Sequence, residues 1–123
     1  MGKTKEVDWP RRGDVYLVNF DPTLGSEIKK TRPALIIQND IGNRWSSITI
    51  VAAITSYSTP EIYPTEVMIE AGEGGLRSRS VIKLDQVRSI DKQRLKHKLG
   101  HIKPNTLTAV NRALMISLEL ISI

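Results

Sequence analysis

The chain has 123 residues and no cysteine, so its length supports one hydrophobic core and its composition excludes disulfides, thiolate metal sites and cysteine nucleophiles. Its 18 Lys and Arg residues outnumber 13 Asp and Glu residues, and the resulting formal charge of +5 favours a polyanionic partner, nucleic acid first. No apolar run approaches the ~18 residues of a membrane span, and the lack of cysteine fits a reducing compartment, so we expect a cytoplasmic protein with no membrane partner.

The first twelve residues are polar and of mixed charge, and we expect residues 1–12 to form a flexible arm before a single domain at residues 13–123. Five short segments of that domain are rich in apolar and β-branched residues, a composition typical of strands. They are residues 14–20, 33–38, 48–55, 66–69 and 80–90. The last of them breaks the strict alternation of apolar side chains, which predicts a bulge or bend.

The segments between and after these strands carry turn and helix signals. Asn39 to Asn43 predicts a turn, because Asn, Asp and Gly tolerate left-handed backbone. Asp91 can cap a short helix over residues 92–98, which Gly100 would end. From Pro104 onward, apolar residues recur at steps of three and four, which predicts a C-terminal amphipathic helix. Together these elements predict a mainly β fold with helices (α+β), built as a small, strongly bent antiparallel sheet or partly open barrel.

The motifs of several enzyme classes are absent from the sequence. It has no HExxH, no Cys–His spacing and no compact Asp and Glu group, so we expect no metal and no cofactor. It also lacks GxGxxG, GxxxxGK[ST] and GxSxG, and Ser26 has no evident base beside it. His97 and His101 could act as an acid and base pair, as in many ribonucleases, but their position in and after the predicted basic helix favours plain surface exposure.

Arg32 stands where a polar, turn-rich segment meets an apolar run, and Pro33 restricts its backbone to extended geometry. An arginine held in this way suits the recognition of an anion such as phosphate, whereas the ordinary alternative is a salt bridge with Glu27. Thr55 ends the third predicted strand at the edge of another polar loop, where its hydroxyl could share a rim with Arg32. The alternative for Thr55 is a β-branched residue that merely ends a strand.

Short motifs with a characteristic order and spacing run along the chain. They are Phe20-Asp21-Pro22-Thr23, Gly25-Ser26-Glu27, Arg32-Pro33-Ala34, Gln38-Asn39, the strand end at Thr55, Pro64 to Val67, and Asp85-Gln86-Val87-Arg88-Ser89-Ile90. Together they resemble the MazF/PemK family of toxin endoribonucleases, which belong to type II toxin-antitoxin systems. The resemblance covers roughly Arg12 to Ile121.

This resemblance implies a small barrel similar to SH3 or CcdB folds, a homodimer, and an antitoxin partner similar to MazE. It also implies metal-independent, sequence-specific cleavage of single-stranded RNA by its own 2′-hydroxyl, which leaves a 2′,3′-cyclic phosphate and a 5′-hydroxyl. The family's catalytic arginine and threonine correspond to Arg32 and Thr55. RNA-binding positions are expected at Gln86 and, in or beside the loops that frame the groove, at Ser26, Glu27 and Asn39.

Two departures from the family pattern concern the cleavage sequence more than the chemistry. Lys29-Lys30-Thr31 stands where several relatives place glycine before the Arg-Pro pair, and Arg79 stands where an acidic residue is common. The six Lys and Arg residues from Arg88 to Lys103 could supply phosphate contacts or simply be solvated. Two other functions remain open: a CcdB-like toxin that poisons gyrase without nuclease activity, and a non-catalytic RNA-binding module.

Overall fold

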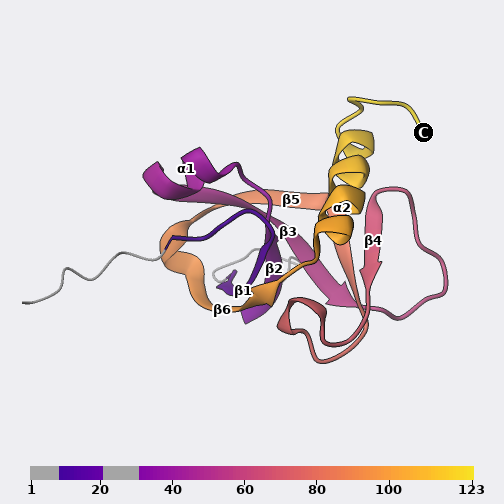
Figure 1. Ribbon diagram of the computed structural model, residues 1–123, viewed down its shortest axis with the longest axis horizontal. Coiled ribbons are helices and arrows are strands. Elements are labelled where there is room, and N and C mark those ends of the chain that lie inside the picture. Colours follow the sequence, from indigo (N-terminus) through magenta and orange to yellow (C-terminus); the bar gives the residue numbers. More distant parts are fainter. Residues whose placement is uncertain (1–8, 21–30) are drawn as a thin grey trace, which may run out of the picture.

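The computed structural model describes residues 9–20 and 31–123 (Figure 1). Within these ranges a single antiparallel sheet has the strand order β4-β5-β3-β2-β1-β6. The strands are β1 (Asp14–Asn19), β2 (Thr31–Ile36), β3 (Ile48–Ser56), β4 (Glu66–Ile69), β5 (Ser80–Asp91) and β6 (Leu95–His101). Helix α2 (Pro104–Ser117) follows the last strand and packs against the sheet. The mainly β fold with a C-terminal helix is therefore confirmed.

Both faces of the sheet bury apolar side chains, because successive residues of the central strands alternate between two clusters. Val15 of β1 joins the cluster that α2 covers with Val110 and Ala113. The second cluster collects the side chains of the opposite face and has no helix over it. Its buried members are Tyr16, Val18, Phe20, Ala34, Ile36, Val51 and Ile90, with Leu95 packed against them.

The sheet covers this second cluster by curling on itself. Three strands separate β5 from β6 in the sheet, yet Ile90 of β5 and Leu95 of β6 meet in the same cluster. The chain needs only the short 3-10 turn Lys92–Arg94 to pass from one strand to the other. This curvature gives the partly open barrel that the sequence predicts.

Strand β5 carries the predicted bulge. Its pairing with β3 passes from Ala52↔Val87 directly to Ala53↔Lys83, so the residues between Lys83 and Val87 have no partner on β3. Such an insertion bends the strand and redirects the side chains that it carries. Residues 85–89 are all exposed, which is unusual for the middle of a paired strand.

The turn predicted at Asn39 to Asn43 is wrong, because these residues begin a short helix, α1 (Asp40–Trp45). Asn39 is its N-cap, and its side chain accepts a hydrogen bond of 2.8 Å from the backbone N–H of Gly42. Asn is favoured both in turns and at helix N-caps, and Asn39 acts here as a helix N-cap. A buried network fixes this helix to the sheet, with Asn43 Oδ1 accepting from Thr49 Oγ1 at 2.7 Å and from Gln38 Nε2 at 3.1 Å.

The predicted helix over residues 92–98 is also wrong. Asp91 caps only the 3-10 turn, accepting from the N–H of Gln93 at 2.8 Å, and the chain then continues as strand β6 beside β1. Lys, Arg and Leu favour helices locally, but pairing with the open edge of β1 overrides this weak preference. Glycine suits position 100 because any larger residue would place its Cβ only 2.6 Å from the carbonyl carbon of Gly74, which is too close.

Residues 9–12, which the sequence analysis assigned to the arm, contact the folded part of the chain. Pro10 is buried, the Arg12 N–H donates to Asp40 Oδ1 at 2.7 Å, and Arg12 Nε donates to the carbonyl of Ile37 at 2.8 Å. The predicted flexibility of the arm therefore stays a prediction for residues 1–8, which lie outside the described residues. In the part of the chain that the structure describes, no helix is long and apolar enough to cross a membrane.

Candidate active site

The register of β2 and β3 brings Arg32 and Thr55 to the same end and the same face of the sheet. Ala34 pairs with Ala53, and Arg32 and Thr55 stand two residues further along their antiparallel strands, beyond the last paired residues. Residues two apart on a strand share a face. Arg32 also pairs with Val18 of β1, which belongs to the second cluster, so the shared face is the one that carries this cluster.

The two side chains differ in exposure, and Arg32 has no carboxylate paired with it in the described ranges. The Arg32 side chain is exposed and Thr55 is half-buried. Among residues 9–20 and 31–123, no carboxylate forms a salt bridge with Arg32. Glu27, its expected alternative partner, lies outside these ranges together with Ser26. The described part of the site thus presents a free guanidinium with a hydroxyl at the neighbouring strand end.

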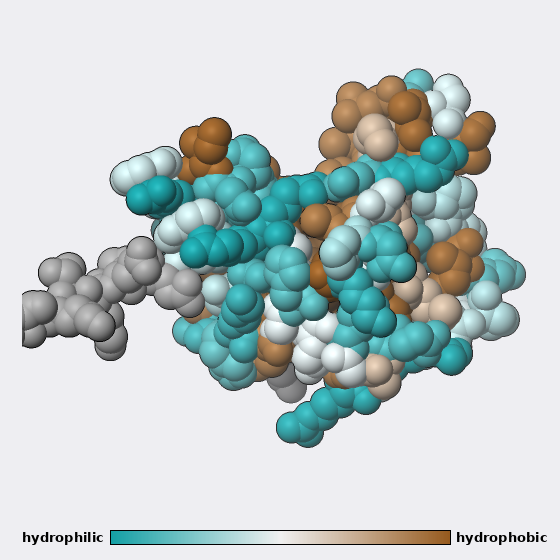
Figure 2. Space-filling model, in the orientation of Figure 1, coloured by the Kyte–Doolittle hydropathy of each residue, from teal (hydrophilic) through white to brown (hydrophobic). Residues whose placement is uncertain are grey.

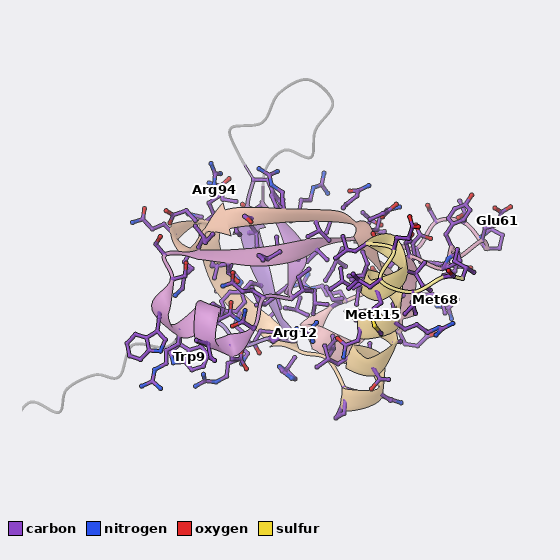
Figure 3. All side chains as sticks on the ribbon, turned by 90° about the horizontal axis from the view of Figure 1, so that it is seen from above. Trp9, Arg12, Glu61, Met68, Arg94 and Met115 are labelled. Carbon is purple, nitrogen blue, oxygen red and sulfur yellow. The ribbon has the colours of Figure 1, made fainter. Side chains whose placement is uncertain are left out.

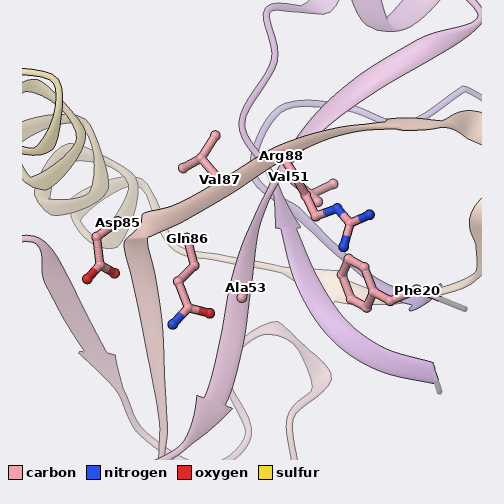
Figure 4. Close-up of a pocket in the computed structure, with 7 residues that line it drawn as sticks. All are labelled: Phe20, Val51, Ala53, Asp85, Gln86, Val87 and Arg88. Atoms are coloured by element: carbon pink, nitrogen blue, oxygen red, sulfur yellow. The ribbon is translucent and has the colours of Figure 1, made fainter. Parts of the chain in front are cut away.

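A hollow of about 240 Å³ opens on this same face of the sheet. Its lining residues come from the end of β1, the middle of β3 and the bulge of β5 (Figure 4). They are Phe20, Val51, Ala53, Asp85, Gln86, Val87 and Arg88. Val51 and Ala53 form its floor on β3, the strand that also carries Thr55 near its end. The hollow and the Arg32–Thr55 end are therefore parts of one continuous surface.

The bulge of β5 turns Gln86 into the hollow, where Figure 4 shows its amide directed past Ala53. An amide can donate and accept hydrogen bonds at once, which matches the mixed donors and acceptors on a nucleobase edge. Of the two expected RNA-binding residues that the structure describes, Gln86 and Asn39, Gln86 is the one that lines this hollow. Phe20 and Arg88 also line the hollow, although the sequence analysis quoted them only within motifs.

Asn39 lies elsewhere. It follows β2, whereas Arg32 stands near the beginning of that strand, so the two residues lie at opposite ends of it. The Asn39 side chain caps α1 through Gly42. Its expected contact with RNA stays a prediction, and the position of Asn39 away from Arg32 does not support it.

The two histidines do not form an acid and base pair beside Arg32. His97 pairs with Leu17 on β1, whereas Arg32 pairs with Val18, the next residue. Because neighbouring residues of a strand point to opposite faces, His97 and Arg32 lie on opposite faces of the sheet. His101 is held at the other end of β1, where its Nδ1 lies 2.7 Å from Oδ1 of the buried Asp14.

The charged side chains that the structure describes at this surface are Arg32 at the strand end and, in the lining of the hollow, Arg88 and Asp85. Within the described ranges, no three His, Cys, Asp or Glu side chains gather in a way that could hold a metal ion. A curled antiparallel sheet that presents an exposed arginine, a neighbouring threonine and a hollow lined by an amide defines a small β protein, with the kind of basic and polar surface that nucleic-acid-binding proteins present.

Comparison with known proteins shows to which family this protein belongs. Residues 11–118 match the family described as PemK-like, MazF-like toxin of type II toxin-antitoxin system, and the chain belongs to this family. It is 50% identical over 111 residues to Endoribonuclease EndoA of Bacillus subtilis (strain 168), covering 90% of this chain and 96% of that protein. It is 48% identical over 110 residues to Endoribonuclease MazF of Staphylococcus saprophyticus, covering 89% and 92% of the two chains.

The fold is also that of a solved toxin. An endoribonuclease in complex with its cognate antitoxin, from Mycobacterial species, superposes with a TM-score of 0.75 at 25% identity, over 93% of this chain and 99% of that one. The resemblance inferred from short motifs is thus confirmed over nearly the whole domain.

Proposed function

We propose that this protein is the toxin of a type II toxin-antitoxin system and an endoribonuclease that cleaves single-stranded RNA at short sequences. The observation that carries the proposal is the register of β2 and β3, which sets Arg32 beside Thr55 on the face that holds the hollow. The endoribonuclease relatives, about half identical over most of the chain, support the same reaction class.

In the proposed reaction, the RNA supplies its own nucleophile. The 2′-hydroxyl oxygen forms a bond to the adjacent phosphorus and loses its proton, the bond from phosphorus to the 5′ oxygen breaks, and that oxygen takes a proton. The products are a 2′,3′-cyclic phosphate and a 5′-hydroxyl. Since the attacking group belongs to the substrate, the protein has to contribute positioning and stabilisation of charge.

Arg32 suits the second task, because the attack builds negative charge on the non-bridging phosphate oxygens. A guanidinium stays protonated and can donate two parallel hydrogen bonds to those oxygens. The exposed Arg32 has no salt bridge with the described residues, so its donors are available to a phosphate. Thr55, half-buried on the neighbouring strand, would add a neutral donor and hold the phosphate in line.

The hollow suits the first task. Its floor of Val51 and Ala53 is apolar, and Gln86 offers an amide to a base edge. Unpaired bases are read in this way, through their edges and by stacking. We infer that a base next to the scissile phosphate enters the hollow and that Gln86 contributes to the choice of cleavage sequence.

We further propose a homodimer. Exposed apolar side chains gather at the C-terminal end of α2 and along β4 and its preceding loop, where Figure 2 shows hydrophobic surface. They are Ile62, Tyr63, Met68, Leu118, Leu120 and Ile123. A group of this kind on a small domain marks a protein contact. Sedimentation at micromolar concentration should give the mass of two chains, and a monomer would contradict the proposal.

A MazE-like antitoxin is the proposed regulator, since the mycobacterial relative was solved with its cognate antitoxin. The cytoplasm, where mRNA and antitoxin are made, is the proposed location. The gyrase-poisoning and non-catalytic alternatives gain no support from the endoribonuclease relatives.

One experiment separates the three functions. The purified protein is incubated with a long single-stranded RNA in EDTA, and the fragment ends are analysed. Discrete fragments with cyclic-phosphate ends support the proposed reaction. Intact RNA together with inhibited gyrase would favour the gyrase toxin, and RNA that is retarded but uncut would favour the binding module.

A further inference from the structure

Arg88 is held in place at the rim of the hollow by an aromatic ring. It stands on β5 opposite Val51, just beyond the bulge, and its guanidinium carbon lies 5.2 Å from the centre of the Phe20 ring. Figure 4 shows the Arg88 side chain extended toward Phe20 along the edge of the hollow. Stacking uses the flat face of a guanidinium, while its N–H donors lie in the plane and stay free for other partners.

The positive charge of Arg88 has no salt-bridge partner in the described ranges, whereas three other cations of the domain are paired with carboxylates. Arg79 pairs with Glu70 at 3.0 Å and Lys83 pairs with Glu66 at 2.7 Å. Lys98 lies 3.3 Å from Asp14. An aromatic ring holds this arginine in place, and no described carboxylate neutralises its charge. Such a guanidinium can bind an anion that comes from another molecule.

The carboxylate that lines the same hollow, Asp85, does not take this role. In Figure 4 Asp85 lies beyond Gln86 and points away from the side where Arg88 meets Phe20. Its charge acts on Lys83, whose pKa it helps to raise. The hollow is therefore polarised, with a carboxylate at one end and, at the other, an arginine that no described carboxylate neutralises.

We propose that Arg88 is a second phosphate-binding residue, which holds an RNA backbone phosphate next to the scissile one while Phe20 fixes its orientation. The inference rests on the proposed function, because it assigns the RNA of that same surface a second point of attachment. Arg32 and Arg88 lie on the surface that the hollow occupies, from different strands, so a single strand bound across them is held on both sides of the base in the hollow. Arg88 is a positioning residue that acts on binding and leaves the chemical step to Arg32 and Thr55.

Binding is best measured apart from cleavage, in an Arg32→Ala background with a long single-stranded RNA as the probe. Adding Arg88→Gln should weaken binding on the order of tenfold at low salt, as expected for a charged hydrogen-bonded contact. The slope of log affinity against log salt should fall by about 0.7, the value for one phosphate contact on a single strand. Arg88→Lys, which keeps the charge and loses the fork, should recover part of the affinity.

Arg112→Gln is the control in the same background, because Arg112 is an exposed arginine of α2, which packs on the opposite face of the sheet from the hollow. Its affinity and salt slope should stay unchanged. In the otherwise active protein, Arg88→Gln should raise KM and leave kcat nearly unchanged. An unchanged affinity and slope for Arg88→Gln, or a loss confined to kcat, would overturn the proposal.

The outcome is separable from that of the proposed function. If the unsubstituted protein does not cut RNA, the reaction is refuted, whereas the binding measurements still decide whether Arg88 contacts phosphate. If the protein cuts RNA and Arg88→Gln binds it as tightly as its parent, the reaction stands and the role of Arg88 falls.

Discussion

Ala34 on β2 faces Ala53 on β3, and the next residue outward on that face of each strand is a functional candidate, Arg32 on one and Thr55 on the other. Both alanine side chains are buried, whereas Arg32 at the end of this face is exposed and Thr55 is half-buried. The antiparallel register alone therefore sets the guanidinium and the hydroxyl beside each other. Any slip of one residue would turn one of them to the opposite face.

Replacing Thr55 with valine keeps the shape of the side chain and removes its hydroxyl. We expect kcat to fall about tenfold to a hundredfold, less than on loss of Arg32, because a neutral donor stabilises the developing charge less than a charged one. Thr55→Ser should retain most of the activity. Thr59→Val in the exposed loop serves as the control and should cut normally. A Thr55→Val protein with full kcat would remove Thr55 from the catalytic pair.

The buried amide of Asn43 should matter for stability and not for catalysis. Its Oδ1 accepts from Gln38 Nε2 and Thr49 Oγ1, and all three side chains are buried. Asn43→Ala removes the acceptor of the Thr49 hydroxyl and of one Gln38 N–H, although Gln38 Nε2 keeps its bond to the carbonyl of Ile48. We therefore expect the free energy of unfolding to fall by about 3 kcal/mol, measured by urea denaturation. Asn111→Ala on the exposed face of α2 should cost almost nothing. Equal stability of the two variants would show that the network contributes little.

The Glu66–Lys83 pair gives a pH dependence of stability. Lys83 Nζ lies 2.7 Å from Glu66 Oε2, and this hydrogen bond lowers the pKa of Glu66 below its usual 4.5 and raises the pKa of Lys83 above its usual 10.5. Glu66 therefore stabilises the fold above pH 4.5, and this stabilisation is lost as the pH falls through its lowered pKa. The contribution of Lys83 is present below pH 10.5 and is lost as the pH rises through its raised pKa.

The test of this pair compares the unfolding free energies of the unsubstituted protein and Lys83→Met. The difference should be clear at about pH 7 and should shrink at about pH 3. Arg79→Met removes an exposed pair, whose side chains are 51% and 63% exposed, and should change stability little at either pH. A Lys83→Met difference that stays constant across this range would contradict the assignment.

Local patterns predicted much of the fold but not its long-range pairings. The first five strands, the bulge of β5 and helix α2 follow from alternation, composition and period, which neighbouring residues encode. Strand β6 was missed, because its lysine-rich sequence favours a helix and only the open edge of β1 makes it a strand. The helix α1 was mistaken for a turn because Asn39 serves both structures.

The candidate site could likewise be predicted from the sequence only in part. Arg32 and Thr55 could be proposed from strand ends and from the resemblance, and their expected shared rim agrees with the register. The stack of Arg88 on Phe20 could not be predicted, since it joins the end of β1 to the far side of a bulge in β5. No local pattern carries such a contact. The contact of His101 with Asp14 could not be predicted either, because it joins the last strand of the chain to the first.

The most direct test of the account is the single-turnover cleavage rate of Arg32→Ala on a long single-stranded RNA in EDTA, measured beside the unsubstituted protein. The account predicts a loss of ~10²- to 10³-fold, the usual effect of removing one donor to a developing oxyanion. Because Arg32 is exposed, the unfolding temperature should not change. A correctly folded Arg32→Ala protein that cuts RNA at nearly the original rate would contradict the central role of this residue.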